Sequence, residues 1–225
     1  MKFEKVGEGE NALVEIILKQ GEHAMIERGS MVYHDGNVEL TGELNSRGGG
    51  FLSALGRSLV SGESLFITKA VGKAPSSKIA VAPCVPGIIE ILQVSDANPW
   101  TINDGAFLAC GGNVNYRVRR QSVSQGFLGT GGLFVMESTG TGEMLIHSCG
   151  DIKVIELDGT APFVVDNDRA LAWTSSLDYT VEAASGLFGF TTGEGFVNRY
   201  SGRGTILVQT RNFKSAVMRY APAGK

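Results

Sequence analysis

The chain repeats one pattern of apolar runs and turns three times along its 225 residues. In each copy an apolar run is followed 11 residues later by a Gly or Asp turn: Leu18 and Gly29, Val94 and Gly105, Leu157 and Asp168. Later landmarks keep step, because Leu133-Phe134 recurs as Phe196-Val197 at the 63-residue offset that also separates Val94 from Leu157. Such a repeat means one supersecondary unit used three times, which constrains the fold more than any single motif.

The repeated elements are short strands. Runs such as Leu13–Leu18 are rich in β-branched residues, Val38–Thr41 alternates with period two, and Asp35-Gly36 is a hairpin turn. Glycine, with 31 of 225 residues, clusters between the runs, as expected for many tight turns. Because helical periodicity is rare, the sequence predicts an all-β sandwich, barrel or β-helix with little helix.

We divide the chain into three β units, 1–84, 85–158 and 159–225, which we expect to pack as one compact body. The first unit is longer than the other two, and its additional residues fall in an insert over 45–60. Apolar residues at helical spacing predict one or two amphipathic turns there. This insert is expected to pack on a sheet end or a subunit contact, or to form a surface for a protein or membrane partner, and its apolar residues are Phe51, Leu52, Leu55 and Leu59.

Charge and cysteine usage favour a cytoplasmic protein. The net charge of −3 leaves no broad basic field for nucleic acid. The first residues lack the apolar run of a secretory signal, and the apolar stretch 79–92 is too short and broken to cross a bilayer. Cys84, Cys110 and Cys149 share no metal-like spacing, so we expect reduced, buried thiols.

Catalytic and cofactor motifs do not stand out in the sequence. A cupin-like metal enzyme needs two or three His and a carboxylate, whereas His23, His34 and His147 are scattered. No Gly-x-Ser-x-Gly elbow is present, and Gly129-Thr130-Gly131-Gly132 lacks the Lys-Ser/Thr ending of a phosphate loop. We therefore expect no catalytic residue, cofactor or metal, and a metal enzyme is the least favoured alternative.

One basic cluster remains, formed by Arg117, Arg119 and Arg120. Alternation puts Arg117 and Arg119 on one face of a strand. They form either a solvated face paired with acids or, repeated around an oligomer, a basic ring that binds RNA or a nucleotide. The equivalent run 178–182 carries acids, which weakens the case for a continuous ring.

Ordered blocks along nearly the whole chain resemble a known family: Ile26–Tyr33, Leu59–Phe66, Ala82-Pro83 with Pro86-Gly87, Val164–Asp166 and Gly204–Asn212. Together they resemble the altered-inheritance-of-mitochondria protein 24 family, whose bacterial and archaeal members are conserved proteins of unknown function. The family's Ala-Glu-x-Gly-Ala-Met block appears here as Ile26-Glu27-Arg28-Gly29-Ser30-Met31, a mild departure.

The resemblance implies units like the tryptophan RNA-binding attenuation protein (TRAP-like), a short relative of the double-stranded β-helix. It also implies a homo-oligomer, with a trimer favoured. Eukaryotic relatives organise the mitochondrial inner membrane, but this chain shows no transit peptide, and the family offers no catalytic residue to transfer. We therefore expect a non-enzymatic oligomeric scaffold or binding protein, with an RNA- or nucleotide-binding ring as the alternative by fold analogy. A protein partner is possible, and no transmembrane segment is expected.

Overall fold

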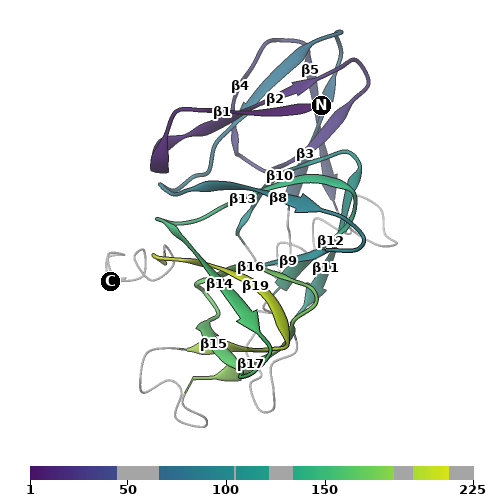
Figure 1. Cartoon of the computed structure of the whole chain (residues 1–225). Coiled ribbons are helices and arrows are strands. Elements are labelled where there is room, and N and C mark those ends of the chain that lie inside the picture. Colours follow the sequence, from purple (N-terminus) through teal and green to yellow (C-terminus); the bar gives the residue numbers. More distant parts are fainter. Residues whose placement is uncertain (45–65, 104, 122–133, 185–194, 213–225) are drawn as a thin grey trace, which may run out of the picture.

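The computed structural model is almost entirely antiparallel β-strand (Figure 1), which confirms the all-β prediction. It describes residues 1–44, 66–103, 105–121, 134–184 and 195–212. Within these ranges the only helical element is a short 3-10 turn, Gly9–Asn11.

After an N-terminal strand β1 (Lys2–Val6), the strands fall into three sets of six. The first set is β2 (Leu13–Leu18), β3 (His23–Glu27), β4 (Met31–His34), β5 (Val38–Leu44), β6 (Phe66–Gly72) and β7 (Ser77–Val81). The second is β8 (Ile89–Val94), β9 (Trp100–Asn103), β10 (Phe107–Gly111), β11 (Val114–Arg120), β12 (Phe134–Gly140) and β13 (Gly142–His147). The third is β14 (Ile152–Asp158), β15 (Phe163–Asp166), β16 (Ala170–Thr174), β17 (Asp178–Ala183), β18 (Phe196–Ser201) and β19 (Arg203–Gln209).

Each set builds two half-sheets by the same rule. The first, last and third strands pair in that order, as in β2-β7-β4, and the fourth, fifth and second pair as in β5-β6-β3. The apolar cluster of the first set joins Ile16 and Ile79 on one half-sheet with Ile26 and Ala70 on the other. Alternation of apolar and polar residues thus gives every half-sheet a buried face, and the two faces close a sandwich.

Consecutive sets share their sheets. β3 of the first set pairs with β10 of the second, and β9 of the second pairs with β16 of the third. The register is the same at both junctions, because Ile26 lies opposite Ala109 and Ile102 lies opposite Ala172. Both alanines are fully buried. Two six-stranded sheets therefore tie the three sandwiches together, with smaller sheets at the two ends.

The third strand of every set carries the same irregularity. The pairing register shifts between Met31 and Tyr33, between Phe107 and Ala109, and between Ala170 and Ala172. A bulge bends a strand locally and re-aims its side chains. Its recurrence shows that the sequence repeat is a structural repeat down to single residues, with the third set beginning at Ile152.

Candidate functional site

The two surfaces singled out from the sequence differ in what the structure says of them. The insert residues Phe51, Leu52, Leu55 and Leu59 lie outside the described residues. Arg117 and Arg119 lie on β11 as expected, Arg117 opposite Glu137 of β12 and Arg119 opposite Val135. Arg119 Nη1 lies 2.5 Å from Glu137 Oε1, and Arg117 Nε lies 4.0 Å from Glu137 Oε2. The two guanidinium groups thus share one carboxylate.

Arg120 ends β11 opposite Phe134. The third set carries a related pair with the charges exchanged, because Arg199 Nε on β18 lies 3.2 Å from Glu182 Oε2 on β17. The basic side chains are therefore partly neutralised within their own sheets. The structure does not gather them into one basic surface among the described residues.

The thiols differ in burial. Cys110 lies within β10, and burial raises the pKa of its thiol to about 12, so this cysteine is the inert, buried residue that we expect. Cys149 is partly buried. The prediction is wrong for Cys84, which is exposed because it lies in the loop after β7. The described residues contain no group of three or more His, Cys, Asp and Glu placed to hold a metal.

Where the repeat ends, β4 and β15 each have one side that no described strand pairs with. β4 is the third strand of its set and has no second strand of a preceding set beside it, while β15 lacks a following third strand. Tyr33 is 42% exposed, whereas its equivalents Ala109 and Ala172 are 0% exposed at the internal junctions. Val32 and, on β15, Phe163 and Val164 are exposed as well. Exposed apolar edge strands are templates for pairing with another chain.

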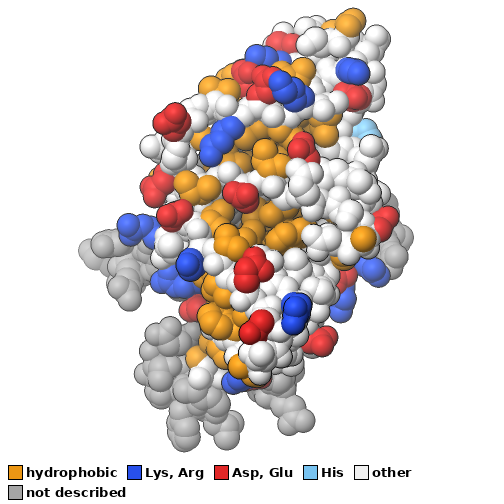
Figure 2. All heavy atoms as spheres, in the orientation of Figure 1, with side chains coloured by type: hydrophobic (Ala, Val, Ile, Leu, Met, Phe, Trp, Pro, Cys, Tyr) orange, Lys and Arg blue, Asp and Glu red, His pale blue; other side chains and the backbone are white. Residues whose placement is uncertain are grey.

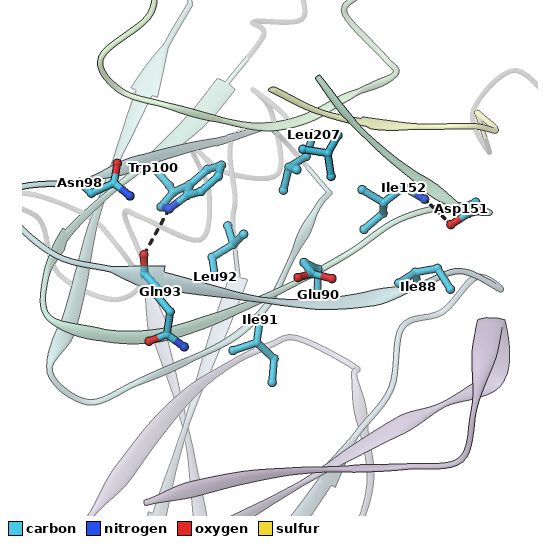
Figure 3. A pocket seen from close by; sticks show the side chains of 11 residues that line it. Ile88, Glu90, Ile91, Leu92, Gln93, Asn98, Trp100, Asp151, Ile152 and Leu207 are labelled. Atoms are coloured by element: carbon cyan, nitrogen blue, oxygen red, sulfur yellow. Dashed lines mark hydrogen bonds between the residues drawn. The ribbon is translucent and has the colours of Figure 1, made fainter. Parts of the chain in front are cut away.

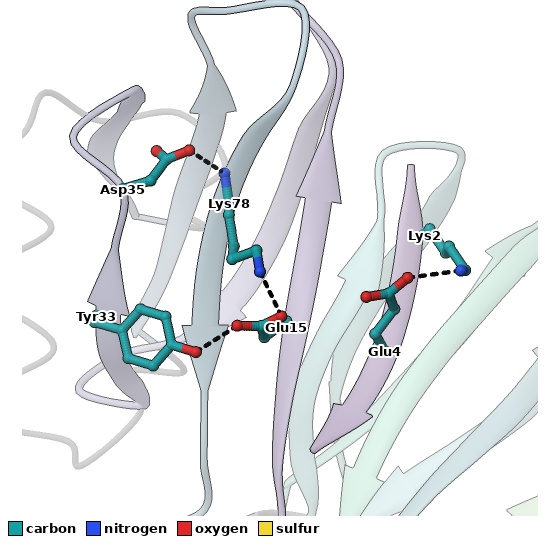
Figure 4. A network of polar contacts seen from close by, with 6 residues as sticks. All are labelled: Lys2, Glu4, Glu15, Tyr33, Asp35 and Lys78. Atoms are coloured by element: carbon teal, nitrogen blue, oxygen red, sulfur yellow. Dashed lines mark hydrogen bonds and ion pairs between the residues drawn. The ribbon is translucent and has the colours of Figure 1, made fainter.

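A polar network fixes one face of β4 (Figure 4). The Tyr33 hydroxyl donates a hydrogen bond of 2.5 Å to Glu15 Oε1, and Lys78 Nζ lies 2.7 Å from Glu15 Oε2. The backbone N–H of Lys78 donates to Asp35 Oδ2 at 3.0 Å. Hydrogen bonds from Lys78 and then Tyr33 hold the pKa of Glu15 below its usual value. The network therefore orders the open edge through its neighbours β2 and β7.

A groove of about 440 Å³ lies between β8 and β14 (Figure 3). Its floor and walls are largely apolar, with Leu92, Trp100, Ile152, Val154 and Leu207. The Trp100 indole is held at one end, where its Nε1 donates a hydrogen bond of 3.3 Å to the Gln93 carbonyl. Figure 2 shows hydrophobic side chains as a band along the middle of this face, with carboxylates beside them.

The charged residues of the groove are acidic. Glu90 and Asp151 line it beside the neutral Gln93 and Asn98, and no Lys, Arg or His lines it within the part of the chain that the structure describes. Figure 3 shows Glu90 on β8, across the groove from Leu207 and Ile152. The carboxylate therefore lies beside apolar side chains, in a setting that favours a cationic ligand group with an apolar neighbour.

The groove arises from how the sets begin. The backbone N–H of Gly87 bonds the Glu10 carbonyl at 3.0 Å, and Gly150 bonds the Pro86 carbonyl at 3.0 Å. At Gly87 a β-carbon would lie 1.8 Å from the Ser148 carbonyl oxygen, so only glycine permits this contact. Beyond it, β8 and β14 run in different sheets. The sequence could not show this groove, because its walls come from different repeats.

These features define a class of all-β proteins in which three antiparallel sandwiches share sheets. Within that class, the family described as Mitochondrial biogenesis AIM24 matches residues 3–211, so the chain belongs to that family, as its sequence blocks predict. No helix in the described ranges is long and apolar enough to cross a membrane.

Two streptococcal proteins are similar over most of their length. Uncharacterized protein M6_Spy0233 from Streptococcus pyogenes serotype M6 is 42% identical over 218 residues, which cover 93% of this chain and 87% of that protein. The crystal structure of protein SPYM3_0169 from Streptococcus pyogenes is 40% identical, with a TM-score of 0.82, and covers 97% of this chain and 99% of that chain.

Proposed function

We propose that the protein is a non-enzymatic scaffold that assembles with copies of itself through β15 and β4. The observation that carries this proposal is the unused junction at each end of the repeat. Inside the chain, a second strand always pairs with the third strand of the following set. Among the described residues β15 pairs only with β18 and β4 only with β7, so each has one open side, and β15 of one copy supplies what β4 of the next copy lacks.

The internal junctions also give the register of this contact. Ile26 lies opposite Ala109 and Ile102 opposite Ala172. Val165 is equivalent to Ile102, because each is the last residue but one of its strand and precedes a final Asp or Asn. Tyr33 is equivalent to Ala109. Val165 of one copy would therefore lie opposite Tyr33 of the next, with the exposed Phe163, Val164 and Val32 close to the contact.

A contact between different edges of two identical chains is head-to-tail, and it closes into a ring or grows into a filament. We favour a ring, and a trimer within that choice, because the family resemblance implies TRAP-like units in a homo-oligomer. A location in the cytoplasm is part of the same proposal. Each added copy repeats one junction, so the assembly needs no other interface.

The experiment is to measure the assembly mass by light scattering after Val32→Asp and, separately, Val164→Asp. Each substitution puts a charge on one open edge and is expected to reduce the assembly to a monomer. Val6→Asp is a matched control, because Val6 is exposed to a similar degree on β1, away from both edges. Mixing the two edge variants gives dimers at most, since each retains one intact edge. A monomeric unmodified protein would contradict the proposal.

The RNA- or nucleotide-binding ring remains an alternative with less support, because Glu137 pairs with both Arg117 and Arg119. It predicts binding that weakens with salt and is lost in Arg119→Glu. Absence of RNA binding at low salt would end this alternative.

A further inference from the structure

At the junction between the first and second sets, the chain's own first strand covers the surface that corresponds to the groove. β1 adds to the edge of β2 in antiparallel register, with Phe3 opposite Ile16 and Lys5 opposite Val14. Phe3 packs against the apolar cluster that Ile16 shares with residues of the second set, and Ile91 of β8 packs against the same cluster. β1 therefore covers the junction between the first and second sets, where Phe3 supplies the apolar side chain.

The corresponding junction between the second and third sets has no such strand among the described residues. β8 pairs with β13 as β2 pairs with β7, so Leu92 is equivalent to Ile16 and Glu90 is equivalent to Val14. β8 ends its sheet, so its outer edge is unpaired there, as the edge of β2 would be without β1. The groove lies along this edge, and Val154 stands where Ile91 stands in the first junction.

We infer that the open edge of β8 binds an extended peptide of a partner protein as an added antiparallel strand. The peptide carries an aromatic side chain opposite Leu92, in the groove, and a Lys or Arg two residues further on, opposite Glu90. The two positions follow from the register of β1, in which Phe3 and Lys5 take these places, and the charge of Glu90 requires a basic side chain at the second. Leu92 and Glu90 both line the groove, and alternation along β8 places them on the same face of the strand (Figure 3).

The chemistry of the groove supports this occupant. Main-chain groups of an added strand satisfy the unpaired backbone of β8, and side-chain pockets give such a contact its specificity. Glu90 and Asp151 attract a cationic side chain. The inference deepens the proposed scaffold function and rests on it for the role of the partner, but the groove uses neither β4 nor β15.

The test is binding of a fluorescent peptide that copies residues 1–8, measured by fluorescence anisotropy with the full chain. Val154→Asp puts a third carboxylate in the groove, where the aromatic ring of the peptide would pack against a charge, and is expected to weaken binding about tenfold or more. Replacing Phe by Ala in the peptide is expected to have a similar effect. Val32→Asp is the matched control, because Val32 and Val154 are both 51% exposed and Val32 lies outside the groove.

Exchanging the charges of Glu90 and of the peptide's second Lys tests whether these two residues lie opposite each other. Glu90→Lys is expected to weaken binding of the peptide about tenfold, and a peptide with Glu in place of its second Lys is expected to recover that loss. Hydrogen exchange then reports the edge: bound peptide slows exchange in β8 and leaves β2, already covered by β1, unchanged.

The outcomes separate this inference from the proposed assembly. Peptide binding that survives Val154→Asp and Glu90→Lys, or no binding at all, overturns the inference whatever the assembly mass. A fall in assembly mass caused by Val154→Asp but not by Val32→Asp shows that a second copy covers the groove, and also overturns it. Peptide binding by a protein whose mass Val32→Asp leaves unchanged supports the inference while the assembly proposal fails.

Discussion

The two internal junctions have the same strand pairing but differ in whether an added strand covers their surface. Both use the same strand pairing, with Ala109 and Ala172 in equivalent places. The first junction is covered by β1, whose Phe3 packs on its apolar cluster, whereas the second presents an open groove. The difference teaches that the repeat specifies the junction and that additional segments decide whether its surface is closed.

The polar ends of the two junctions differ as well. At the first, the buried His147 has its Nε2 3.7 Å from Glu27 Oε2. At the second, the equivalent positions hold Asn103 and Gln209. Asn103 Nδ2 donates to the Ala170 carbonyl at 2.9 Å, and Gln209 Nε2 donates to the Asp168 carbonyl at 2.7 Å. An ionisable pair in one junction is thus replaced by neutral amides in the other.

The largest effect is expected from charges placed inside the shared pairing. Ala109→Asp and Ala172→Asp each bury a carboxylate without a partner, which should lower the free energy of unfolding by about 4 kcal/mol or more. Val32→Asp, on the open edge of β4 and outside the Glu15 network, should change the free energy of unfolding of the monomer by less than about 1 kcal/mol. Urea denaturation followed by circular dichroism measures all three. Similar losses in all three variants would mean that the internal junctions are not the tighter ones.

Removing the cover of the first junction comes next. Phe3→Ala should lower the free energy of unfolding by about 2 kcal/mol, less than for a fully buried Phe, because Phe3 is only partly buried. Val6→Ala, on the same strand but exposed, should cost less than about 0.5 kcal/mol. Thermal denaturation compares the two, and hydrogen exchange in β2 should quicken in Phe3→Ala. Equal losses would show that Phe3 does not cover the junction.

The strands, the turns and the threefold unit could be read from the sequence, because they depend on local alternation and on glycine. Gly29 and Gly105 each adopt a positive φ in the turn between second and third strands, a conformation that glycine adopts without strain. Asp168 takes the equivalent position in the third set, because Asp is also tolerated in such turns. The family resemblance rested on similar local blocks and is confirmed.

The sharing of sheets could not be read in the same way. Ala109 and Ala172 look like ordinary strand residues, and their small size becomes meaningful only beside Ile26 and Ile102 of another set. The groove depends on β8, β14 and β19 together, and the role of Phe3 depends on a strand pairing that the repeat does not contain. Exposure of Cys84 was missed because an apolar, proline-flanked run reads as buried.

Lowering the pH should destabilise the first junction more than the second. Burial lowers the pKa of His147 below 6.5, its usual value, so the unfolded chain binds a proton that the native chain does not. Stability is therefore full above pH 6.5 and falls as the pH drops below it, until the native pKa is reached. His147→Gln copies the amide of the second junction and should flatten this part of the profile. Denaturation at several pH values tests it, and an unchanged slope in the variant would contradict this origin.

The smallest effect should come from filling the open junction. Val154→Phe places a ring in the groove beside Trp100 and Leu207, as Phe3 does in the first junction. The apolar area that the ring removes from water should raise the free energy of unfolding by about 0.5–1 kcal/mol. Val164→Phe, an exposed position on β15, controls for the added ring itself and should give no gain in a monomeric background. The filled groove should also lose its peptide. Equal stability of the two variants would show that an aromatic side chain does not fit the groove, and the likeness between the two junctions would end at the backbone.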